Sequence, residues 1–553
     1  MTGPLVFGQP PADNSLFYGD CLDWMRRWPD NCVNLIYLDP PFNSKQDYNM
    51  LYSAQVAGDA QYRAFADTWV WDDAAADRLD GYMGAIARPA HNAIAGLNRM
   101  LGQSGMLAYL TYMAERLEEC WRLLAPTGGI YLHCDPTASH YLKAVMDGIF
   151  GAGNFRSEII WKRTYAHGRA LRWGPVHDVL LFYSKTDKWT WNRTYQAYDP
   201  FYVEKNYRHK DKHGRYRHVT LDGPGTRGGP SGLPWRGVDP TVAGRHWEVP
   251  PDRALPPWIN LPDGYPHMTV QERLDVLDEQ GLIYWPPKGT KPSYRRYLSV
   301  APGNQIQDVV TDISAIGARA AERLGYPTQK PRALLERIIE ASSNKGDLVL
   351  DPFCGCGTAV DAAQRLGRRW IGVDISSFAV DVMLERLGDR TIPVYGIPYD
   401  LHSARRMAAD DPFGFETWAV NRLRGFVPNT KQVADGGIDG RAHLAVQPDD
   451  WKSRLALAQV KGGKHHPIDG LRAFSSVVDR RKAALGCYIT VEPFNTASAR
   501  KVATSPSTIH VGGYPYQRFH RWSIADYFDE RPPPLPPMNN PYTGKPMAQG
   551  ELF

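Results

Sequence analysis

"LVLDPFCGCGTAVDAAQRLGRRWIGVDIS", residues 348–376, is the stretch that decides the fold. An apolar run from Leu348 to Leu350 leads into Asp351 and a glycine-containing turn, and a segment with helical periodicity follows. A second apolar run, Trp370 to Val373, ends in Asp374. Because a strand, a helix and a strand come in this order, the stretch predicts a parallel sheet with helices packed on it.

The turn in this stretch also suggests a ligand. Gly355 and Gly357 would let the backbone approach a ligand closely, and an acid at the end of the next strand, Asp374, can bind ribose hydroxyls. The match to the phosphate-binding pattern GxGxxG is incomplete, because no third glycine follows in register. This favours a nucleoside-bearing cofactor without a pyrophosphate, such as S-adenosylmethionine. Cys354 and Cys356 have no partner ligands at a zinc spacing, so we expect them to be small filling side chains.

A second strand end, in "NLIYLDPPFN" (34–43), has a different chemistry. Its apolar run predicts a buried strand that ends in Asp39, Pro40, Pro41 and Phe42. Ligands of parallel sheets bind at the carboxyl edge of the strands, and prolines leave their carbonyls free to accept. Asp39 and a proline carbonyl could therefore accept hydrogen bonds from one amino group while Phe42 stacks on a flat base. The alternative is a strand followed by an ordinary proline turn.

Together with "YGDCLDWM" (18–25) and "TQKP" (328–331), these motifs resemble the amino-methylating DNA methyltransferases of the β class. In that class the catalytic motif comes first, the recognition segment next and the cofactor loop last, and the order here is the same. The resemblance covers roughly residues 15–185 and 300–390. It departs at Cys356, where the family commonly has serine, a near-isosteric change that should not abolish cofactor binding.

The resemblance implies methyl transfer from S-adenosylmethionine to an exocyclic amine of double-stranded DNA. An Asp at the head of the motif favours adenine N6, and cytosine N4, which usually accompanies Ser, is the alternative. Acceptors on the amine would favour a more tetrahedral nitrogen whose lone pair points at the methyl group, and the base must leave the duplex to reach the pocket. The expected catalytic residues are Asp39, Pro40, Pro41 and Phe42. The expected cofactor-binding residues are Asp20, which would contact the cofactor adenine, Lys330, Asp351, Phe353, Gly355, Gly357, Thr358 and Asp374.

Residues 186–300 are rich in Trp, Tyr, Arg, Gly and Pro and lack sustained periodicity. They occupy the place of a target-recognition domain. The basic and aromatic cluster from Arg208 to His218 suits phosphate contact and base stacking, and a solvated charged loop is the alternative. His133 and His167 stand alone in the sequence, so we expect core or surface roles for them rather than catalytic ones.

The C-terminal region contains a third group of motifs: "FETWAVNRLRGF" (415–426), "DGGIDG" (435–440) and "ALAQVKGG" (456–463). The first predicts an amphipathic helix and the second a glycine-bracketed turn. In the third, Gln459 and Lys461 lie on one face of a strand, because strand side chains alternate.

These motifs resemble the Mrr-type branch of the PD-(D/E)xK nucleases, in which Gln replaces the usual acid, over roughly residues 410–480. The expected catalytic residues are Glu416, Asp439, Gln459 and Lys461. Asp439 and Gln459 would be ligands of Mg²⁺, which prefers oxygen donors, and a metal beside an ammonium can stabilise charge in phosphodiester cleavage. The alternative is an ordinary α/β domain with a surface lysine.

The predicted fold class is α/β: a Rossmann-like S-adenosylmethionine-dependent methyltransferase with an inserted target-recognition domain and a C-terminal α/β restriction-endonuclease-like domain. We expect the methyltransferase to be split into a catalytic segment, residues 1–185, and a cofactor-binding segment, residues 301–400, with the target-recognition domain, residues 186–300, between them. The Mrr-like nuclease domain is expected at residues 401–530, followed by a proline-rich, extended or disordered tail at residues 531–553.

Bulk properties limit the remaining choices. The chain has 553 residues, 43% hydrophobic and 22% charged, with a net charge of +5, so any nucleic-acid footprint must be local. No apolar run approaches the roughly 20 residues that span a bilayer, and we expect neither a signal peptide nor a membrane partner. Seven scattered cysteines argue against a disulfide framework and for a reducing cytoplasm.

The leading hypothesis is a restriction–modification enzyme in one chain, acting on double-stranded DNA, with a homodimer left open. A second hypothesis keeps the methyltransferase but makes the last domain a non-cleaving DNA-binding module. A third, an RNA or protein methyltransferase, is disfavoured by the motif order. Because there is no GxxxxGK[ST] loop, we expect no ATP-driven translocation within this chain.

Overall fold

The computed structural model describes residues 11, 13–41, 48–50, 62–65, 69–164, 171, 173–287, 291–317, 319–324, 326, 328–389, 391–429, 437–445, 454–463, 468–493, 508–539 and 547. Two compact units separate in it. One is Arg193–Ile306, and the other combines Met1–Asn192 with Gln307–Phe553. None of the described helices is both long and apolar enough to span a membrane.

The centre of the larger unit is a sheet to which both flanks of the inserted segment contribute strands. Within the described residues, its strands run in the order β16 (Val309–Val310), β6 (Phe155–Lys162), β7 (His177–Ser184), β5 (Leu124–Cys134), β2 (Val33–Leu38), β17 (Leu348–Asp351), β18 (Arg369–Asp374), β1 (Ser15–Tyr18) and β19 (Val394–Tyr395). Neighbours are parallel except that β7 is antiparallel to both β5 and β6. The predicted α/β class with a mainly parallel sheet is confirmed.

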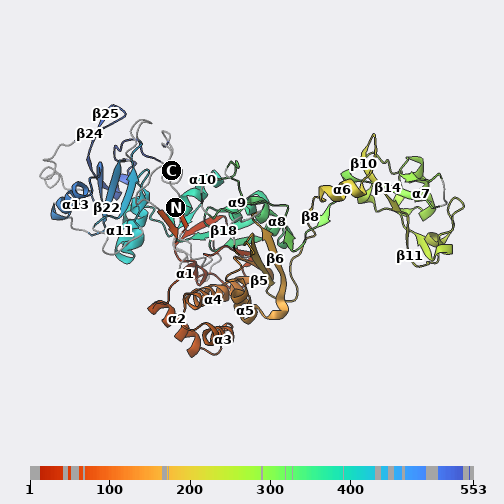
Figure 1. Ribbon diagram of the computed structural model, residues 1–553, viewed down its shortest axis with the longest axis horizontal. Coiled ribbons are helices and arrows are strands. Elements are labelled where there is room, and N and C mark those ends of the chain that lie inside the picture. The colour runs from red at the N-terminus through yellow and green to blue at the C-terminus, as the bar shows by residue number, and fades with distance from the viewer. Residues whose placement is uncertain are drawn as a thin grey trace. The chain divides into compact units, whose positions relative to one another are not determined.

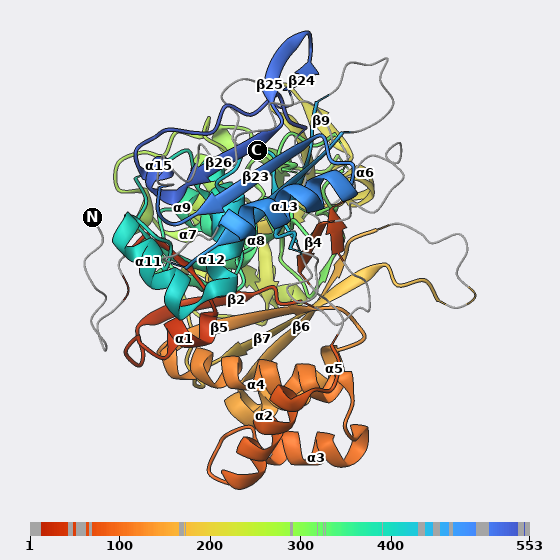
Figure 2. The same cartoon turned by 90° about the vertical axis from the view of Figure 1, so that its left-hand side faces the viewer.

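Helices cover both faces of this sheet (Figure 1). Figure 2 shows the N-terminal helices gathered against one side of the sheet. The helices of that side are α2 (Asp73–Gly84), α3 (His91–Leu101), α4 (Gly105–Leu123) and α5 (Ser139–Phe150), and those of the other are α8 (Arg332–Ser342), α9 (Thr358–Arg365) and α10 (Ser377–Leu387). Alternation sends Ile36 and Leu38 into the first core and Leu35 and Tyr37 into the second. Burial on both faces explains why β2 reads as a continuous apolar run.

The strand order brings the two sequence motifs to one edge. β17 lies between β2 and β18, with Leu350 opposite Ile36 and Leu350 also opposite Ile371. Both pairings are parallel, so the residues that follow β2 and β17 leave the sheet at the same end. Asp39 and the glycine loop, over 300 residues apart in sequence, are thereby neighbours at the carboxyl edge.

The unit Arg193–Ile306 has its own small sheets and an aromatic core. Its sheets join β13 (Ile283–Tyr284), β14 (Ser293–Tyr297), β10 (Gly214–Thr220) and β9 (His209–Asp211); β11 (Asp222–Pro224) and β12 (Arg245–Trp247); and β8 (Tyr195–Gln196) and β15 (Asn304–Gln305). Its α-helices are α6 (Pro200–Asn206) and α7 (Val270–Glu279). The unit starts later than the predicted residue 186, because the backbone N–H groups of Thr190 and Asn192 bond to carbonyls of the larger unit.

A second sheet forms the C-terminal part of the larger unit. It runs in the order β20 (Val427–Pro428), β21 (Gly440–His443), β22 (Leu455–Lys461), β23 (Leu485–Thr490) and β26 (Phe519–Ser523). The accompanying elements are α11 (Leu401–Asp410), α12 (Pro412–Asn421), α13 (Ile468–Arg480), α15 (Ile524–Phe528), β24 (Thr508–Val511) and β25 (Tyr514–Gln517), while α1 (Cys21–Met25), β3 (Tyr48–Met50) and β4 (Tyr62–Phe65) belong to the N-terminal part. This is the predicted α/β arrangement.

The proline-rich tail differs in part from its prediction. The described residues 531–539 form no helix, and they pack on the C-terminal sheet rather than standing apart from residue 531 on. Met538 is fully buried, and Ala445 N donates to Pro537 O at 2.8 Å. Two apolar side chains among the prolines, Leu535 and Met538, pack into the C-terminal core and hold this segment, which composition alone does not reveal.

Candidate active site

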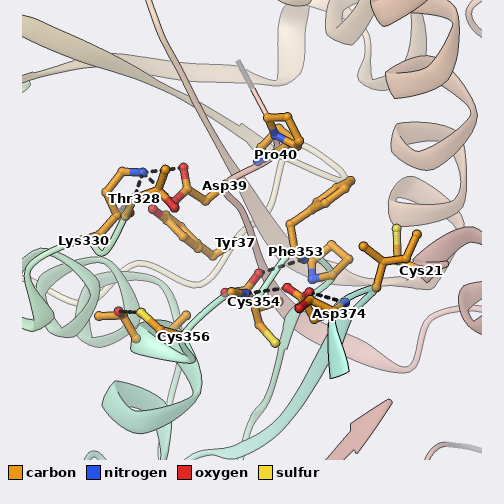
Figure 3. Close-up of a pocket in the computed structure, with 18 of the residues that line it drawn as sticks. Cys21, Tyr37, Asp39, Pro40, Thr328, Lys330, Phe353, Cys354, Cys356 and Asp374 are labelled. Carbon is orange, nitrogen blue, oxygen red and sulfur yellow. Dashed lines mark hydrogen bonds and ion pairs between the residues drawn. The ribbon is translucent and has the colours of Figure 1, made fainter. Parts of the chain in front are cut away.

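The carboxyl ends of β2, β17, β18 and β1 surround an open cavity of about 1010 Å³ (Figure 3). All four sequence motifs contribute to its wall, including "TQKP" from the segment before α8. Of the described residues that line it, four are aspartates and one is a lysine. These charged residues are Asp20, Asp39, Asp351, Asp374 and Lys330. Carboxyl groups therefore outnumber cationic groups among the lining residues.

The loop after β17 is fastened to the end of β18. Cys354 N donates to Val373 O at 3.0 Å, and Gly355 N donates to Asp374 Oδ2 at 2.8 Å. Gly357 has φ of +74°, and a Cβ there would lie 2.6 Å from Met383 Cγ. Gly357 is therefore required by the packing of the loop on α10, and it stands behind the cavity rather than in its wall.

Asp374 is held as a hydrogen-bond acceptor at the cavity. Its second carboxylate oxygen accepts from Ser376 N at 2.8 Å. Burial raises the pKa of Asp374 to about 6, although the two backbone donors act in the opposite direction. Burial also raises the pKa of Asp351 well above its usual range, and the charges of Asp39 and Asp374 add to this.

Asp20 also lines the cavity and is fixed from two sides. Its Oδ1 accepts from Leu22 N at 2.8 Å and caps α1, and its Oδ2 accepts from Arg116 Nη2 at 2.5 Å. The Arg116 guanidinium in turn lies 3.3 Å from the centre of the Tyr112 ring, which lines the cavity. Sequence reasoning missed Arg116, because nothing in the α4 pattern marks a cation that reaches Asp20.

Asp39 forms an ion pair inside the cavity. Lys330 Nζ lies 2.7 Å from Asp39 Oδ1 and 2.5 Å from Oδ2, and both side chains are largely buried. Figure 3 shows this pair on one wall, with Tyr37 beside it. The sequence predicts that Lys330 contacts the cofactor, and the structure adds a direct contact with the proposed catalytic carboxylate.

The remaining predicted residues of this site have different surroundings. Pro40, Pro41 and Phe353 line the cavity, whereas Phe42 lies outside the described residues. Thr358 also lines it, but its hydroxyl accepts from Arg386 Nη1 at 2.8 Å. Arg386 thus holds the first turn of α9 in place. All seven cysteines are free, and the two in the loop, Cys354 and Cys356, are buried, as expected.

In the C-terminal sheet, Asp439 lies against the strand that carries Gln459. Asp439 N donates to Ala458 O at 2.9 Å, and its Oδ2 accepts from Val460 N at 2.7 Å. Gln459 is buried and Lys461, at the end of β22, is exposed. The residue opposite Gln459 on β23 is Tyr488, whose pKa is raised by burial and further by the charge of Asp439.

Glu416 approaches this group from a helix. It is half-buried on α12, which contacts β22. The four predicted nuclease residues thus come from three adjoining elements. Among the described residues, no three His, Cys, Asp or Glu side chains cluster as a metal site. A cation here would therefore need the Gln459 carbonyl as well as carboxylates.

Comparisons with known proteins match two regions of the chain to two families. Residues 33–385 match a family model described as DNA methylase, and residues 408–512 match one described as restriction endonuclease. Type II methyltransferase M.EcaI of Enterobacter cloacae is 32% identical over 288 residues, which cover 52% of this chain and 59% of that protein. The type III restriction-modification enzyme StyLTI Mod subunit of Salmonella typhimurium is 26% identical over 372 residues, covering 64% and 50%.

DNA adenine methyltransferase YhdJ of Escherichia coli is 46% identical over a shorter stretch of 86 residues, 16% of this chain and 28% of that protein. The chain spans only about half the length of the first two relatives. The DNA methylase model, however, covers well over half of this chain. The protein therefore belongs to the DNA methylase family, and it carries a restriction-endonuclease domain in its C-terminal part.

Proposed function

We propose that the chain methylates adenine N6 in double-stranded DNA with S-adenosylmethionine as methyl donor, and that its C-terminal domain is a Mg²⁺-dependent DNA endonuclease. One observation carries the methyltransferase proposal. Asp39 and Pro40 line the same cavity as the glycine loop, Asp374 and Asp20. Groups suited to an amino group and groups suited to a nucleoside thus face one space.

The residues present fit the cofactor. Asp374 offers acceptors for ribose hydroxyls and Asp20 an acceptor for the adenine amino group. When bound, S-adenosylmethionine supplies an electrophilic methyl group on a cationic sulfonium, and the lining carboxylates favour that charge.

Asp39 and the Pro40 carbonyl act on the target amine. The lone pair of an aromatic amine is delocalised into the ring, so the amine is a weak nucleophile. Two acceptors on its hydrogens favour a tetrahedral nitrogen and direct the lone pair across the cavity. Lys330 contacts both oxygens of Asp39, so the arriving amine must share that carboxylate. A carboxylate has about four lone-pair sites, which allows this sharing.

Adenine is preferred over cytosine as the target for two reasons. Asp rather than Ser heads the catalytic motif, and the relative with the highest identity among those described above is named an adenine methyltransferase. Methylation mapping distinguishes the two products directly. N6-methyladenine and N4-methylcytosine differ in mass and occur in different sequence contexts.

The unit Arg193–Ile306 is proposed to bind the DNA target. On β10 and its two neighbours, Arg215 faces Lys210 and Arg217 faces Arg296 across the ladder. Like charges directly opposite each other destabilise a sheet. A row of phosphates would neutralise all four of these cations, and phosphate contacts supply most of the affinity for DNA.

In the proposed nuclease site, Asp439, the Gln459 carbonyl and Glu416 would hold Mg²⁺. Because Gln459 replaces an acid, the site has one fewer negative charge, and we expect comparatively weak metal binding. Lys461, exposed at the strand end, would stabilise charge on the scissile phosphate.

The test uses the full chain and unmethylated genomic DNA from a methylation-deficient host. With S-adenosylmethionine and no Mg²⁺, single-molecule sequencing should find N6-methyladenine at one recurring sequence. With Mg²⁺ and no S-adenosylmethionine, the same DNA should be cut. Absence of any base methylation would overturn the first proposal. Absence of cutting under any divalent metal would instead make the C-terminal domain a DNA-binding module.

A further inference from the structure

A chain of buried polar side chains crosses the sheet behind Asp39. Tyr37 of β2, His133 of β5 and Asp178 of β7 come from three neighbouring strands and share one sheet face. Tyr37 Oη lies 2.9 Å from His133 Nδ1, and His133 Nε2 lies 3.3 Å from Asp178 Oδ2. All three residues are at most 2% exposed, yet Tyr37 lines the cavity. From the sequence alone, His133 is predicted to have only a core or surface role.

The contacts of Asp178 determine which group donates and which accepts in these hydrogen bonds. Arg163 Nε lies 3.2 Å from Asp178 Oδ1, the carboxylate oxygen that His133 does not use. Burial alone would raise the pKa of Asp178, but the hydrogen bond with His133 and the charges of His133, Lys330 and Arg163 hold it below its usual range. An ionised carboxylate can only accept, so His133 Nε2 donates to it. In the imidazole form of His133 this leaves Nδ1 as an acceptor, and Tyr37 donates to it.

This direction determines what Tyr37 presents to the cavity. With the imidazole form of His133 the hydroxyl hydrogen is directed to Nδ1, so only the oxygen lone pairs face the space that Asp39 also lines. Burial raises the pKa of Tyr37 well above its usual range, and the charges of Asp39, Asp351 and Asp178 add to this. We propose that His133 and Asp178 are positioning residues that lock Tyr37 as an acceptor-only group, so that the pocket selects a base edge bearing amino hydrogens and rejects a keto oxygen.

The inference rests on the proposed methyltransferase function and names a further basis for its specificity. Asp178→Asn tests it with almost no change of shape. Because the Arg163 guanidinium lies 3.2 Å from the oxygen that His133 does not use, the amide oxygen should face Arg163 and the amide nitrogen should face His133. The imidazole proton would then move to Nδ1, and Tyr37 would donate into the cavity instead of accepting.

Two measurements follow, both on full-length protein and on oligonucleotides that carry the site found by methylation mapping. In single-turnover methylation, Asp178→Asn should be on the order of 10-fold to 100-fold slower, because a donor now opposes the amine. Removing that donor in Asp178→Asn/Tyr37→Phe should make the enzyme faster than Asp178→Asn alone. Purely structural damage would make the double variant slower.

The second measurement is a gain of binding. In a duplex with hypoxanthine at the target position, a keto oxygen replaces the amino group. Asp178→Asn should bind this duplex several-fold better, relative to the adenine duplex, than the parent chain does. Tyr131→Phe is the matched control, since Tyr131 is equally buried on β5 and bonds to Ser342 Oγ at 2.7 Å but does not line the cavity. It should keep the parental preference.

The outcomes separate the two proposals. If the parent chain methylates no DNA, the proposed function fails and the inference fails with it. If the parent methylates its site while Asp178→Asn keeps both the parental rate and the parental preference for adenine, the inference alone is overturned. A double variant slower than Asp178→Asn also overturns it.

Discussion

At the scale of single residues, the Asp39–Lys330 pair joins positions that are 291 residues apart. Sequence motifs predicted both residues separately, but not their contact, because no local pattern encodes which side chains meet across an inserted unit. The same holds for Tyr37, His133 and Asp178, each of which reads as an ordinary core residue of its own strand. Acids at strand ends are recognisable in a sequence, whereas the groups that orient them are not.

The pair predicts that stability and catalysis can be separated at Asp39. Asp39→Ala should lower methylation by on the order of 10² to 10³, since one positioned acceptor is lost. It should also lower stability by roughly 2 kcal/mol, because the largely buried ammonium of Lys330 loses its partner. Asp39→Ala/Lys330→Met should recover the melting temperature but not the methylation.

Calorimetry with S-adenosylmethionine should show nearly unchanged affinity for Asp39→Ala. The control is Asp23→Ala, which removes an exposed acid of α1 that does not line the cavity. It should leave the methylation rate unchanged. Parental methylation by Asp39→Ala would remove Asp39 from the catalytic assignment.

A second prediction at this scale concerns pH and Asp374. Its pKa is about 6 in the folded protein, so the carboxylate becomes protonated as the pH falls through that value. A protonated acid accepts fewer hydrogen bonds from ribose hydroxyls, and affinity for S-adenosylmethionine should fall roughly tenfold between about pH 7.5 and pH 5. Isothermal calorimetry at several pH values measures this. A flat profile would contradict the assignment.

The pH dependence of folding stability that Asp374 contributes has the opposite sign to its effect on cofactor affinity. A raised pKa means that the folded, cofactor-free protein binds this proton more tightly than the unfolded chain does. The contribution of Asp374 to stability is therefore largest below the unfolded value of about 3.9 and is lost as the pH rises through about 6. Asp374→Asn should bind the cofactor weakly and remove this group's share of both pH dependences.

At the scale of elements, the strands that bear the site were predictable because burial on both faces gives continuous apolar runs. β2, β17, β18 and β22 all begin and end within a residue or two of the predicted runs. The polar segments were harder. Nothing in the composition shows that the start of the proline-rich tail completes the C-terminal core through Leu535 and Met538, since two apolar residues among prolines produce no periodicity.

The cofactor loop gives a prediction with a matched control. Gly357 and Gly367 have nearly the same φ, +74° and +71°. A Cβ would lie 2.6 Å from Met383 Cγ at Gly357, whereas at Gly367 it would meet nothing within 4 Å. Gly367→Ala should therefore cost only about 1 kcal/mol of backbone strain. Gly357→Ala should cost more and should also weaken cofactor binding, because the loop must move.

Thermal unfolding and calorimetry of the two variants measure this difference. Equal effects on the melting temperature, together with parental cofactor affinity in both, would show that the packing of the loop on α10 does not control the cofactor site.

At the scale of the whole molecule, the pairing of β8 with β15 allows most of the unit Arg193–Ile306 to be deleted. β8 and β15 pair as antiparallel strands at the ends of the unit Arg193–Ile306, with Gln196 opposite Asn304. Replacing residues 197–303 by Asn-Gly would close these strands as a two-residue hairpin. We expect S-adenosylmethionine to bind with parental affinity and site-selective methylation to be lost.

This deletion tests the target-recognition assignment alone, because none of the cavity-lining residues lies between 197 and 303. Methylation mapping of the deleted protein on genomic DNA is the measurement. Continued methylation of the parental sequence would place recognition in the larger unit.

The final prediction concerns the independence of the two proposed activities. Asp439→Ala and Lys461→Ala should each stop Mg²⁺-dependent cutting and leave methylation unchanged, because the two sites share no residues. Arg480→Ala, which removes an exposed cation from α13 of the same domain, should change neither activity. Gln459→Glu should restore the missing charge and lower the Mg²⁺ concentration needed for cutting.

Methylation by the same chain should protect the DNA, because a restriction–modification enzyme must spare its own modified sites. Duplexes carrying the mapped site, unmethylated or methylated beforehand, are incubated with Mg²⁺ and resolved on a gel. Cutting only of the methylated duplex would make the domain modification-dependent. Cutting that survives Lys461→Ala, or an unchanged Mg²⁺ requirement in Gln459→Glu, would move the metal and the charge-stabilising cation to other residues. An unchanged Mg²⁺ requirement in Gln459→Glu would be the most informative of these outcomes. Gln459 and Lys461 lie on one face of β22, and Asp439 Oδ2 accepts from Val460 N of the same strand, so the proposed site is centred on this strand.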